Sequence, residues 1–475
     1  MSNSPVPISF GTQADTGRYS ADGGPEHLNC YIQSVNEGKH PYPIYAAGGF
    51  SLLTSVTNAN DCRGIAQFSD TIAYALMGSA VVKLEYDGSS TFFTIIGGIT
   101  TLDRAIMAVN QKSGGRQVAI VTGGLKYSIE GDNLLEITDA DLPTPISVTF
   151  LNQRVIYAIE DGRHYYSDVD DVRSVGSSSF FSSEGDNDDN VRGIAHKQEY
   201  WAFGKKSIEV WRDTGASTAP YRRNTSVNIQ KGCAARDSVA SLDEDIFWLA
   251  DDFSVYRAQG YAPMPLYHQA LDEDIRKTVD KSEIRAFTYH SRGAAFYVIK
   301  SNSWTWQYNR TTNKWFKRKS HGLDFWRAEC SVELSGKTIF GDYQSPNFYL
   351  LDEDVFSENG EALVMRLRSA PMHDYPNQMI IDRLYLDFIL GVGLNSSNTW
   401  ESNPQVGIRW SDDLGLTWSN QRFRPLGKLS DRNGRVVFQE LGQTNEQGRV
   451  WEIEVSSPVV RSLSYAAVLG DKLQA

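Results

Sequence analysis

Long apolar runs and the short motifs of common enzymes are missing from this sequence. No apolar run reaches the roughly 18 residues that a membrane-spanning helix requires, and residues 1–13 lack the basic-then-apolar layout of a signal peptide. The GxSxG turn of serine hydrolases, the HExxH helix of zinc proteases and the glycine-rich nucleotide-binding loops are also missing. We therefore expect a soluble, non-enzymatic chain made in the cytosol, with no catalytic residue, cofactor, metal site or membrane span.

Cysteine is scarce, and its spacing fits neither a disulfide framework nor a zinc site. Both of those use dense or paired cysteines, such as CxxC. The cysteines are instead scattered, at Cys30, Cys62, Cys233 and Cys330. We expect four buried free thiols, as in a protein from a reducing compartment.

Positive charge is in deficit. The sequence holds 46 Lys and Arg against 58 Asp and Glu, which leaves a net charge of −12. A protein that grips nucleic acid needs Lys and Arg to replace the counterions of the phosphates, so affinity for DNA is not expected. An acidic surface repels DNA at short range, and this still allows DNA to pass without being bound.

Aromatic residues and glycine are abundant. Phe, Trp and Tyr make up 12% of the chain, and there are 39 glycines. Aromatic and β-branched side chains suit pleated, half-buried strands, and glycine suits the tight turns between them. The composition therefore predicts an all-β protein.

A degenerate repeat runs through the middle of the chain. Each block is an apolar strand, a polar turn and a strand with an aromatic-rich end, and the blocks recur at roughly the 40 to 50 residues of a propeller blade. The blocks begin at Gly64, Gln117, Val148, Gly193, Ser238, Ala286 and Lys337. This rhythm predicts a β-propeller of five to eight blades, although a sandwich or several small barrels also fit it.

Composition and strand length suggest three regions. Residues 1–55 are rich in proline and glycine and are expected to form an extended arm, and residues 56–362 the propeller body. Residues 363–475 contain longer alternating strands, which predict an additional antiparallel β-sandwich-like domain. The polar run from Ser177 to Asn190 is expected to be a loop.

The sharpest short motif is an Asp box, with the pattern S-x-D-x-G-x-T-W. Its members are Ser411, Asp413, Gly415 and Trp418. In such a box the Ser and Asp side chains bind backbone groups of a hairpin turn, glycine takes the left-handed conformation and tryptophan covers the strands. The motif is structural even in sialidases, so it predicts a locked turn and no active site.

A second feature is an acidic run at Glu184, Asp186, Asp188 and Asp189. Carboxylates suit hard cations such as calcium, but the run lacks the alternating acids, central glycine and distant glutamate of an EF-hand. We interpret it as a solvated loop, which could face a channel or a partner protein.

Several phrases, in order, resemble the packaged-DNA stabilisation proteins of podoviruses, also called tail nozzle or tail hub proteins. They include SIEVWRDTG (207–215), VNIQKGCAA (227–235), DIFWLADDFSVYRAQG (245–260), TWQYNRTTNKW (305–315) and IRWSDDLGLTWS (408–419). These phrases cover most of the chain from about residue 190 onward, and LNCYIQSVNEGKHPYPIYAAGGFSLL (28–53) resembles the opening of that family.

The resemblance implies a structural protein of the virion tail of a short-tailed bacteriophage. A subunit of this kind assembles as a sixfold ring, a homo-hexamer, below the portal and its head-to-tail adaptor. The ring extends and closes the DNA exit channel, retains the packaged genome until DNA ejection and anchors tail fibres, spikes or a plug. Genomic DNA passes through it without specific binding.

Two other functions fit parts of the sequence. The Asp box also occurs in sialidases, so a glycan-binding or sialidase-like propeller is the main alternative. Such an enzyme needs clustered arginines and a tyrosine nucleophile. Candidate arginines are Arg222, Arg223, Arg236 and Arg257, but no spacing in the sequence connects them to one site. A cellular propeller scaffold is the third possibility.

Overall fold

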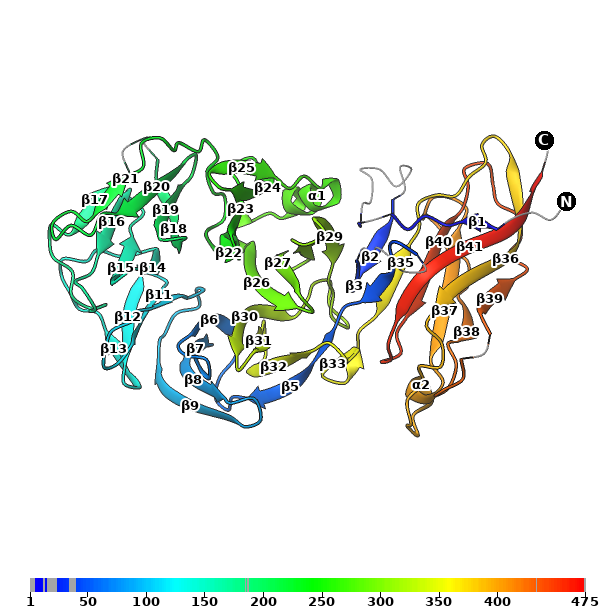
Figure 1. The fold of residues 1–475 in the computed structure, drawn as a ribbon, viewed down its shortest axis with the longest axis horizontal. Coiled ribbons are helices and arrows are strands. Elements are labelled where there is room, and N and C mark those ends of the chain that lie inside the picture. Colours follow the sequence, from blue (N-terminus) through cyan, green and yellow to red (C-terminus); the bar gives the residue numbers. More distant parts are fainter. Residues whose placement is uncertain are drawn as a thin grey trace.

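The computed structural model describes residues 5–11, 13–14, 24–33, 40–183, 185, 188–432 and 434–473. Figure 1 shows two β bodies side by side, a propeller and a sandwich. The helical elements are short: α1 (Gln269–Lys277), α2 (Thr399–Ser402), and the 3-10 turns η2 (Arg236–Ser238) and η3 (Lys281–Glu283). The expected all-β fold, a propeller with a C-terminal sandwich, is confirmed.

Seven four-stranded blades can be traced in the described part of the chain. From the axis outward, the first three contain β6 (Cys62–Gln67), β7 (Ile72–Met77), β8 (Ala80–Tyr86) and β9 (Thr91–Gly98); β10 (Ile106–Val109), β11 (Gln117–Thr122), β12 (Leu125–Glu130) and β13 (Asn133–Glu136); and β14 (Ser147–Leu151), β15 (Arg154–Ala158), β16 (Arg163–Tyr166) and β17 (Phe180–Ser182). The prediction of a loop over 177–190 was therefore wrong at β17.

The next three blades follow the same order along the chain. They contain β18 (Asn190–His196), β19 (Glu199–Gly204), β20 (Ile208–Asp213) and β21 (Tyr221–Arg223); β22 (Ala240–Leu242), β23 (Asp245–Leu249), β24 (Val255–Gln259) and β25 (Ala262–Pro265); and β26 (Arg285–Ser291), β27 (Ala294–Lys300), β28 (Thr305–Asn309) and β29 (Lys314–Lys317). The second strands β11 and β23 are buried along their whole length because neighbouring blades cover both faces.

The seventh blade is completed by a strand from before the first. Its inner strands are β30 (Ala328–Leu334), β31 (Lys337–Asp342) and β32 (Asn347–Asp352), and its outermost strand is β5 (Gly49–Ser55), antiparallel to β32. Phe50 of β5 is fully buried in the core of this blade. The short hairpin of β33 (Ser357–Glu358) and β34 (Glu361–Ala362) continues this sheet beyond β5. The ring is thus closed by pairing between distant parts of the chain.

The sandwich is built from both ends of the sequence. One sheet contains β2 (Glu26–Leu28), β35 (Met365–Arg368), β40 (Val450–Val455), β37 (Gln405–Ser411) and β38 (Arg422–Pro425). The other contains β3 (Cys30–Ile32), β4 (Ile44–Ala46), β41 (Ser462–Leu473), β36 (Gln378–Phe388), β39 (Val436–Gln439) and, on β41, β1 (Val6–Pro7). Between the sheets lie buried side chains that include Leu384, Ile408, Phe438 and Trp451. The boundaries at 55/56 and 362/363 stay a prediction.

Asn29 joins the two bodies. It lies between β2 and β3, has a positive φ of 53° and is 1% exposed. Its side-chain amide donates to the carbonyls of Lys319 and Val364, both at 2.9 Å, and its side-chain oxygen accepts from the amide of Lys319 at 3.0 Å. In the same region β2 pairs with propeller strand β29 on one side and with β35 on the other. One continuous sheet therefore crosses the junction.

Replacing Asn29 by alanine removes three buried hydrogen bonds and leaves their backbone partners unpaired. We expect a loss of about 2–4 kcal/mol in the free energy of unfolding, measured in urea. Asn359→Ala is the matched control, because Asn359 also has a positive φ (51°) but is exposed. If the two variants lose the same stability, the side-chain bonds of Asn29 contribute nothing.

Candidate functional site: the axial cavity of the propeller

A cavity of about 980 Å³ lies at the end of the propeller axis where the innermost strands begin. Its lining includes residues at or just before the first strand of every blade: Asp61, Arg63, Asp103, Arg104, Ile146, Val191, Arg236, Asp237, Glu283, Arg285 and Glu329. Carboxylates and guanidinium groups of different blades therefore meet on the axis.

Two of these charged side chains are oriented by β-bulges. In the pairing of β6 with β7, Arg63 is an extra residue between Cys62 and Gly64. In the pairing of β30 with β31, Glu329 is an extra residue between Ala328 and Cys330. A bulge re-aims the side chain of its extra residue, and both of these side chains line the cavity.

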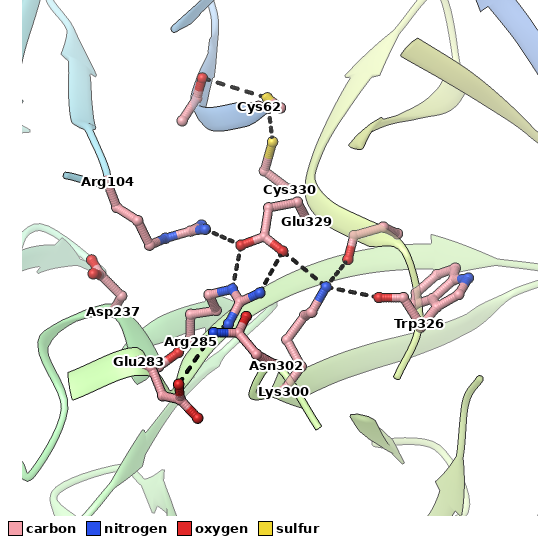
Figure 2. Close-up of polar contacts among 12 residues, drawn as sticks. Cys62, Arg104, Asp237, Glu283, Arg285, Lys300, Asn302, Trp326, Glu329 and Cys330 are labelled. Carbon is pink, nitrogen blue, oxygen red and sulfur yellow. Dashed lines mark hydrogen bonds and ion pairs between the residues drawn. The ribbon is translucent and has the colours of Figure 1, made fainter. Parts of the chain in front are cut away.

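Glu329 is the centre of a buried charge cluster (Figure 2). Its carboxylate accepts hydrogen bonds from Arg104 of the second blade, from both Nε and Nη2 of Arg285 of the sixth, and from Lys300 at 2.8 Å. Lys300 is fully buried and also donates to the carbonyls of Trp326 and Ala328, each at 2.7 Å. Three blades are thus tied to one carboxylate.

Electrostatics keep this carboxylate ionised. Burial by itself raises the pKa of Glu329, but the positive charges of Lys300, Arg104 and Arg285 outweigh burial and hold the pKa well below its usual range. In the same way burial raises the pKa of Asp237, and the charges of Arg236 and Arg104 overcome it and hold this pKa below its usual value.

Other arginines extend the network around the axis. Arg63 donates to the carbonyls of Gly78 (2.8 Å) and Asp103 (2.5 Å), the latter just before the second blade. Arg236 pairs with Asp237 at 3.0 Å, and Arg192 of the fourth blade approaches Asp237 at 3.6 Å. These ion pairs and hydrogen bonds connect the inner ends of neighbouring blades around the cavity.

What this cavity can do chemically is limited. Its volume matches that of a small-ligand pocket and not that of a duplex passing through. In the described ranges no group of three or more His, Cys, Asp or Glu side chains is placed to hold a metal ion. No helix of the described residues is long and apolar enough to cross a membrane. Sequence reasoning missed this cluster, because Arg104 and Glu329 lie 225 positions apart.

The Asp-box residues lie in the sandwich, at the end of β37 and in the turn that follows it. The Ser411 hydroxyl donates to Asp413 at 2.7 Å and accepts from the Gly415 amide at 2.7 Å. The Thr417 hydroxyl and amide donate to Asp413 at 2.6 and 2.8 Å, and these bonds lower the pKa of Asp413 to about 2. The ring of Trp418 is covered by Arg368 and Arg409, 4.9 and 4.8 Å from its centroid. All the groups of this motif are engaged in one turn of the sandwich.

Replacing Gly415 by valine should destabilise this turn, because its φ is +96° and a β-branched residue is strained there. We expect a loss of about 1–3 kcal/mol in the free energy of unfolding, with hydrogen exchange accelerated in residues 411–419. Leu416→Val is the control, since Leu416 is 72% exposed on the same turn. Equal stability of the two variants would contradict the assigned turn.

Of the acidic run, Glu184 and Asp186 lie outside the described residues. Asp188 accepts from the backbone amides of Lys205 and Ser207, both at 3.0 Å, and so holds the turn between β19 and β20. Asp189 pairs with the side chain of Lys205 at 2.7 Å, with both side chains more than half exposed. A channel-facing or partner-facing role for this run stays a prediction.

The arginines considered for binding a sugar carboxylate do not converge. Arg223 approaches Glu209 at 3.4 Å, Arg257 approaches Asp245 at 3.9 Å, and Arg236 pairs with Asp237. Each lies in or beside a different blade element and faces its own carboxylate. The described side chains thus give the Asp box no partner site for a glycan.

Comparison with known families identifies the class of protein that this fold and cavity belong to. The family model described as bacteriophage P22 Gp10, β-propeller, matches residues 6–356, and the one described as bacteriophage P22 Gp10, β-sandwich, matches residues 365–469. The chain belongs to the bacteriophage P22 Gp10 family, the phage packaged-DNA stabilisation or tail nozzle family. It is therefore a phage structural protein.

Solved structures with likeness to the chain are distant. The WD40 β-propeller domain of Doa1 is 9% identical over 64% of this chain and 97% of its own, at a TM-score of 0.42. PorZ of the type-IX secretion system of Porphyromonas gingivalis is 12% identical over 78% of this chain and 46% of its own, at a TM-score of 0.40. None of the curated proteins compared matches the chain. Likenesses this remote say nothing about function.

Proposed function

We propose that the chain is a non-enzymatic subunit of the ring-shaped tail nozzle of a short-tailed bacteriophage. In this role six copies extend and close the DNA exit channel below the head-to-tail adaptor, retain the packaged DNA until ejection and anchor fibres, spikes or a plug. The observation that carries the proposal is the match of both family models, which together cover the propeller and the sandwich.

The ion pairs around Glu329 favour a DNA channel formed between several subunits over one that runs through the propeller of a single chain. Ion pairs such as Arg104–Glu329 and Arg285–Glu329 join different blades at the end of the propeller axis, and the cavity there is about 980 Å³. A channel wide enough for duplex DNA therefore has to form between subunits. The surplus of 58 acidic over 46 basic residues suits such a channel, because carboxylates repel the phosphates that slide past them.

Electron microscopy of the purified full chain, alone and mixed with its adaptor and portal, tests this function. We expect closed rings with sixfold symmetry and an axial channel that dock coaxially on the adaptor, and virions that lose their DNA when this chain is removed. Monomers that ignore the adaptor, together with virions that keep their DNA without it, would refute the proposal. A sialoside turnover assay on the same sample is expected to show no activity.

A further inference from the structure

Two buried cysteines meet where the propeller ring closes. Cys62 begins β6 of the first blade and Cys330 lies in β30 of the seventh, 268 positions later. Figure 2 shows the two side chains pointing toward each other. Their sulfur atoms are 2.7 Å apart, and the two residues are 0% and 6% exposed. This separation is within about 0.7 Å of a disulfide bond length. The sulfurs are thus already placed for a bond between the first and last blades.

The backbone on both sides is shaped for this contact. Cys62 precedes the extra residue of the β6 bulge, and Cys330 follows the extra residue of the β30 bulge. The bulges occupy facing positions in adjacent innermost strands and aim the intervening charges, Arg63 and Glu329, into the axial cavity. Because side chains alternate along a strand, the cysteines beside them are turned away from those charges and toward each other.

Gly341 provides the space that the two sulfurs occupy. It lies opposite Cys330 in the pairing of β30 with β31. A Cβ atom at Gly341 would be 2.5 Å from the sulfur of Cys62 and 3.0 Å from that of Cys330. Its φ is not in the left-handed region, so this position needs glycine for room rather than for backbone freedom.

We propose that Cys62 and Cys330 are a redox pair whose disulfide covalently closes the propeller ring when the chain leaves a reducing compartment. The oxidant is a low-molecular-weight disulfide. Cys62 attacks one of its sulfurs and releases the first small thiol, and Cys330 then attacks the mixed disulfide and releases the second. The two cysteines lose two electrons and two protons, and the small disulfide is reduced to two thiols.

The surroundings of the pair determine how fast it reacts. Cys62 is among the residues at the axial cavity but is 0% exposed, so a small oxidant reaches its sulfur only when the structure around it opens transiently. The neighbouring Cys330 thiol and burial raise the pKa of Cys62 well above its ordinary value. Since the thiolate is the attacking species, oxidation is slow at neutral pH and accelerates as the pH is raised.

The test uses the purified full chain incubated with oxidised glutathione or with a thiol reductant. After blocking of free thiols, peptide mapping is expected to find one cross-linked peptide pair, containing Cys62 and Cys330, with Cys30 and Cys233 free. The oxidised protein should be two hydrogen atoms lighter, and its Tm should rise by roughly 5–8 °C because the bond spans a long loop. Reductant should reverse both changes.

Variants separate ring closure from general thiol oxidation. Cys62→Ser should abolish the reductant-dependent Tm shift, whereas Cys233→Ser, another buried cysteine at the cavity, should keep it in full. Gly341→Ala retains both cysteines but crowds the sulfurs, and should reduce cross-linking. The proposal is overturned if the folded chain stays reduced under conditions that oxidise a urea-unfolded sample, if Cys62 pairs with Cys30 or Cys233, or if the bond forms without raising the Tm.

Discussion

Glu329→Gln is expected to lower the free energy of unfolding by about 3–5 kcal/mol, because removal of one partner strands the other charges in the interior. The carboxylate is 6% exposed and accepts from Lys300, Arg104 and Arg285. A glutamine keeps the shape of the side chain but removes its charge, so Lys300, which is fully buried, remains without a counter-ion. Urea unfolding followed by tryptophan fluorescence measures the loss.

Two variants show whether the buried charges are the cause. Glu244→Gln breaks the ion pair with Lys197, whose side chains are 77% and 47% exposed, and should cost no more than about 1 kcal/mol. Adding Lys300→Met to Glu329→Gln removes one of the stranded charges and should recover part of the loss. If Glu329→Gln lowers the free energy of unfolding no more than Glu244→Gln does, the ion pairs of Glu329 do not hold the blades together.

The same cluster sets an expectation for pH. The folded-state pKa of Glu329 lies well below its unfolded value, so its contribution to stability is present above an unfolded pKa of about 4.3 and is lost as the pH falls toward the folded value. Wild-type stability should therefore drop more steeply below this pH than that of Glu329→Gln. Parallel slopes for the two proteins would contradict the assigned pKa direction.

Phe50→Ala is expected to cost about 3–5 kcal/mol, as large-to-small changes of buried aromatics do. Phe50 is fully buried and its ring centroid is 4.5 Å from that of Tyr349. The core around it contains aromatic side chains from the sixth and seventh blades: Phe287, Tyr289, Phe296, Trp326 and Phe340. Truncation of this side chain should loosen β5 from β32 and raise hydrogen exchange at residues 347–352.

Leu52→Ala is the control on the same strand, because Leu52 is 45% exposed. Its cost should stay below about 1 kcal/mol, and protection of residues 347–352 should be unchanged. Were both variants equally stable, closure of the seventh blade would not depend on the side chain that β5 buries.

The blade rhythm could be predicted from the sequence because the second strands are continuous apolar runs, such as QVAIVT of β11 and DIFWL of β23. The number of blades could not. Outermost strands such as β17 (FFS), β21 (YRR) and β25 (APMP) are three or four residues long, too short to show an alternation of apolar and polar residues. Phe181 of β17 packs against Tyr200 and Trp211 of the next blade, and a contact between residues this far apart cannot be predicted from a local sequence pattern.

The Asp box and the Glu329 cluster also differ in how well the sequence could predict them. The Asp-box hydrogen bonds join residues no more than four positions apart, such as Ser411 with Gly415, so a spacing pattern is able to represent them. The bonds of Glu329 to Arg104 and Arg285 span 225 and 44 positions. A charged residue at the start of a strand gives no sign of its partner, so this cluster becomes visible only when the blades are arranged around the axis.

Strand β5, which completes the seventh blade, also determines when during synthesis the propeller can be completed. β5 is synthesised before the first blade, but its partner β32 ends at Asp352, about 300 residues later. At roughly 5–20 residues per second this strand waits about 15–60 s for its pairing edge. The blades between them can form one after another as they emerge, yet none of them completes the ring. Commitment to the native structure therefore falls after synthesis of the whole propeller.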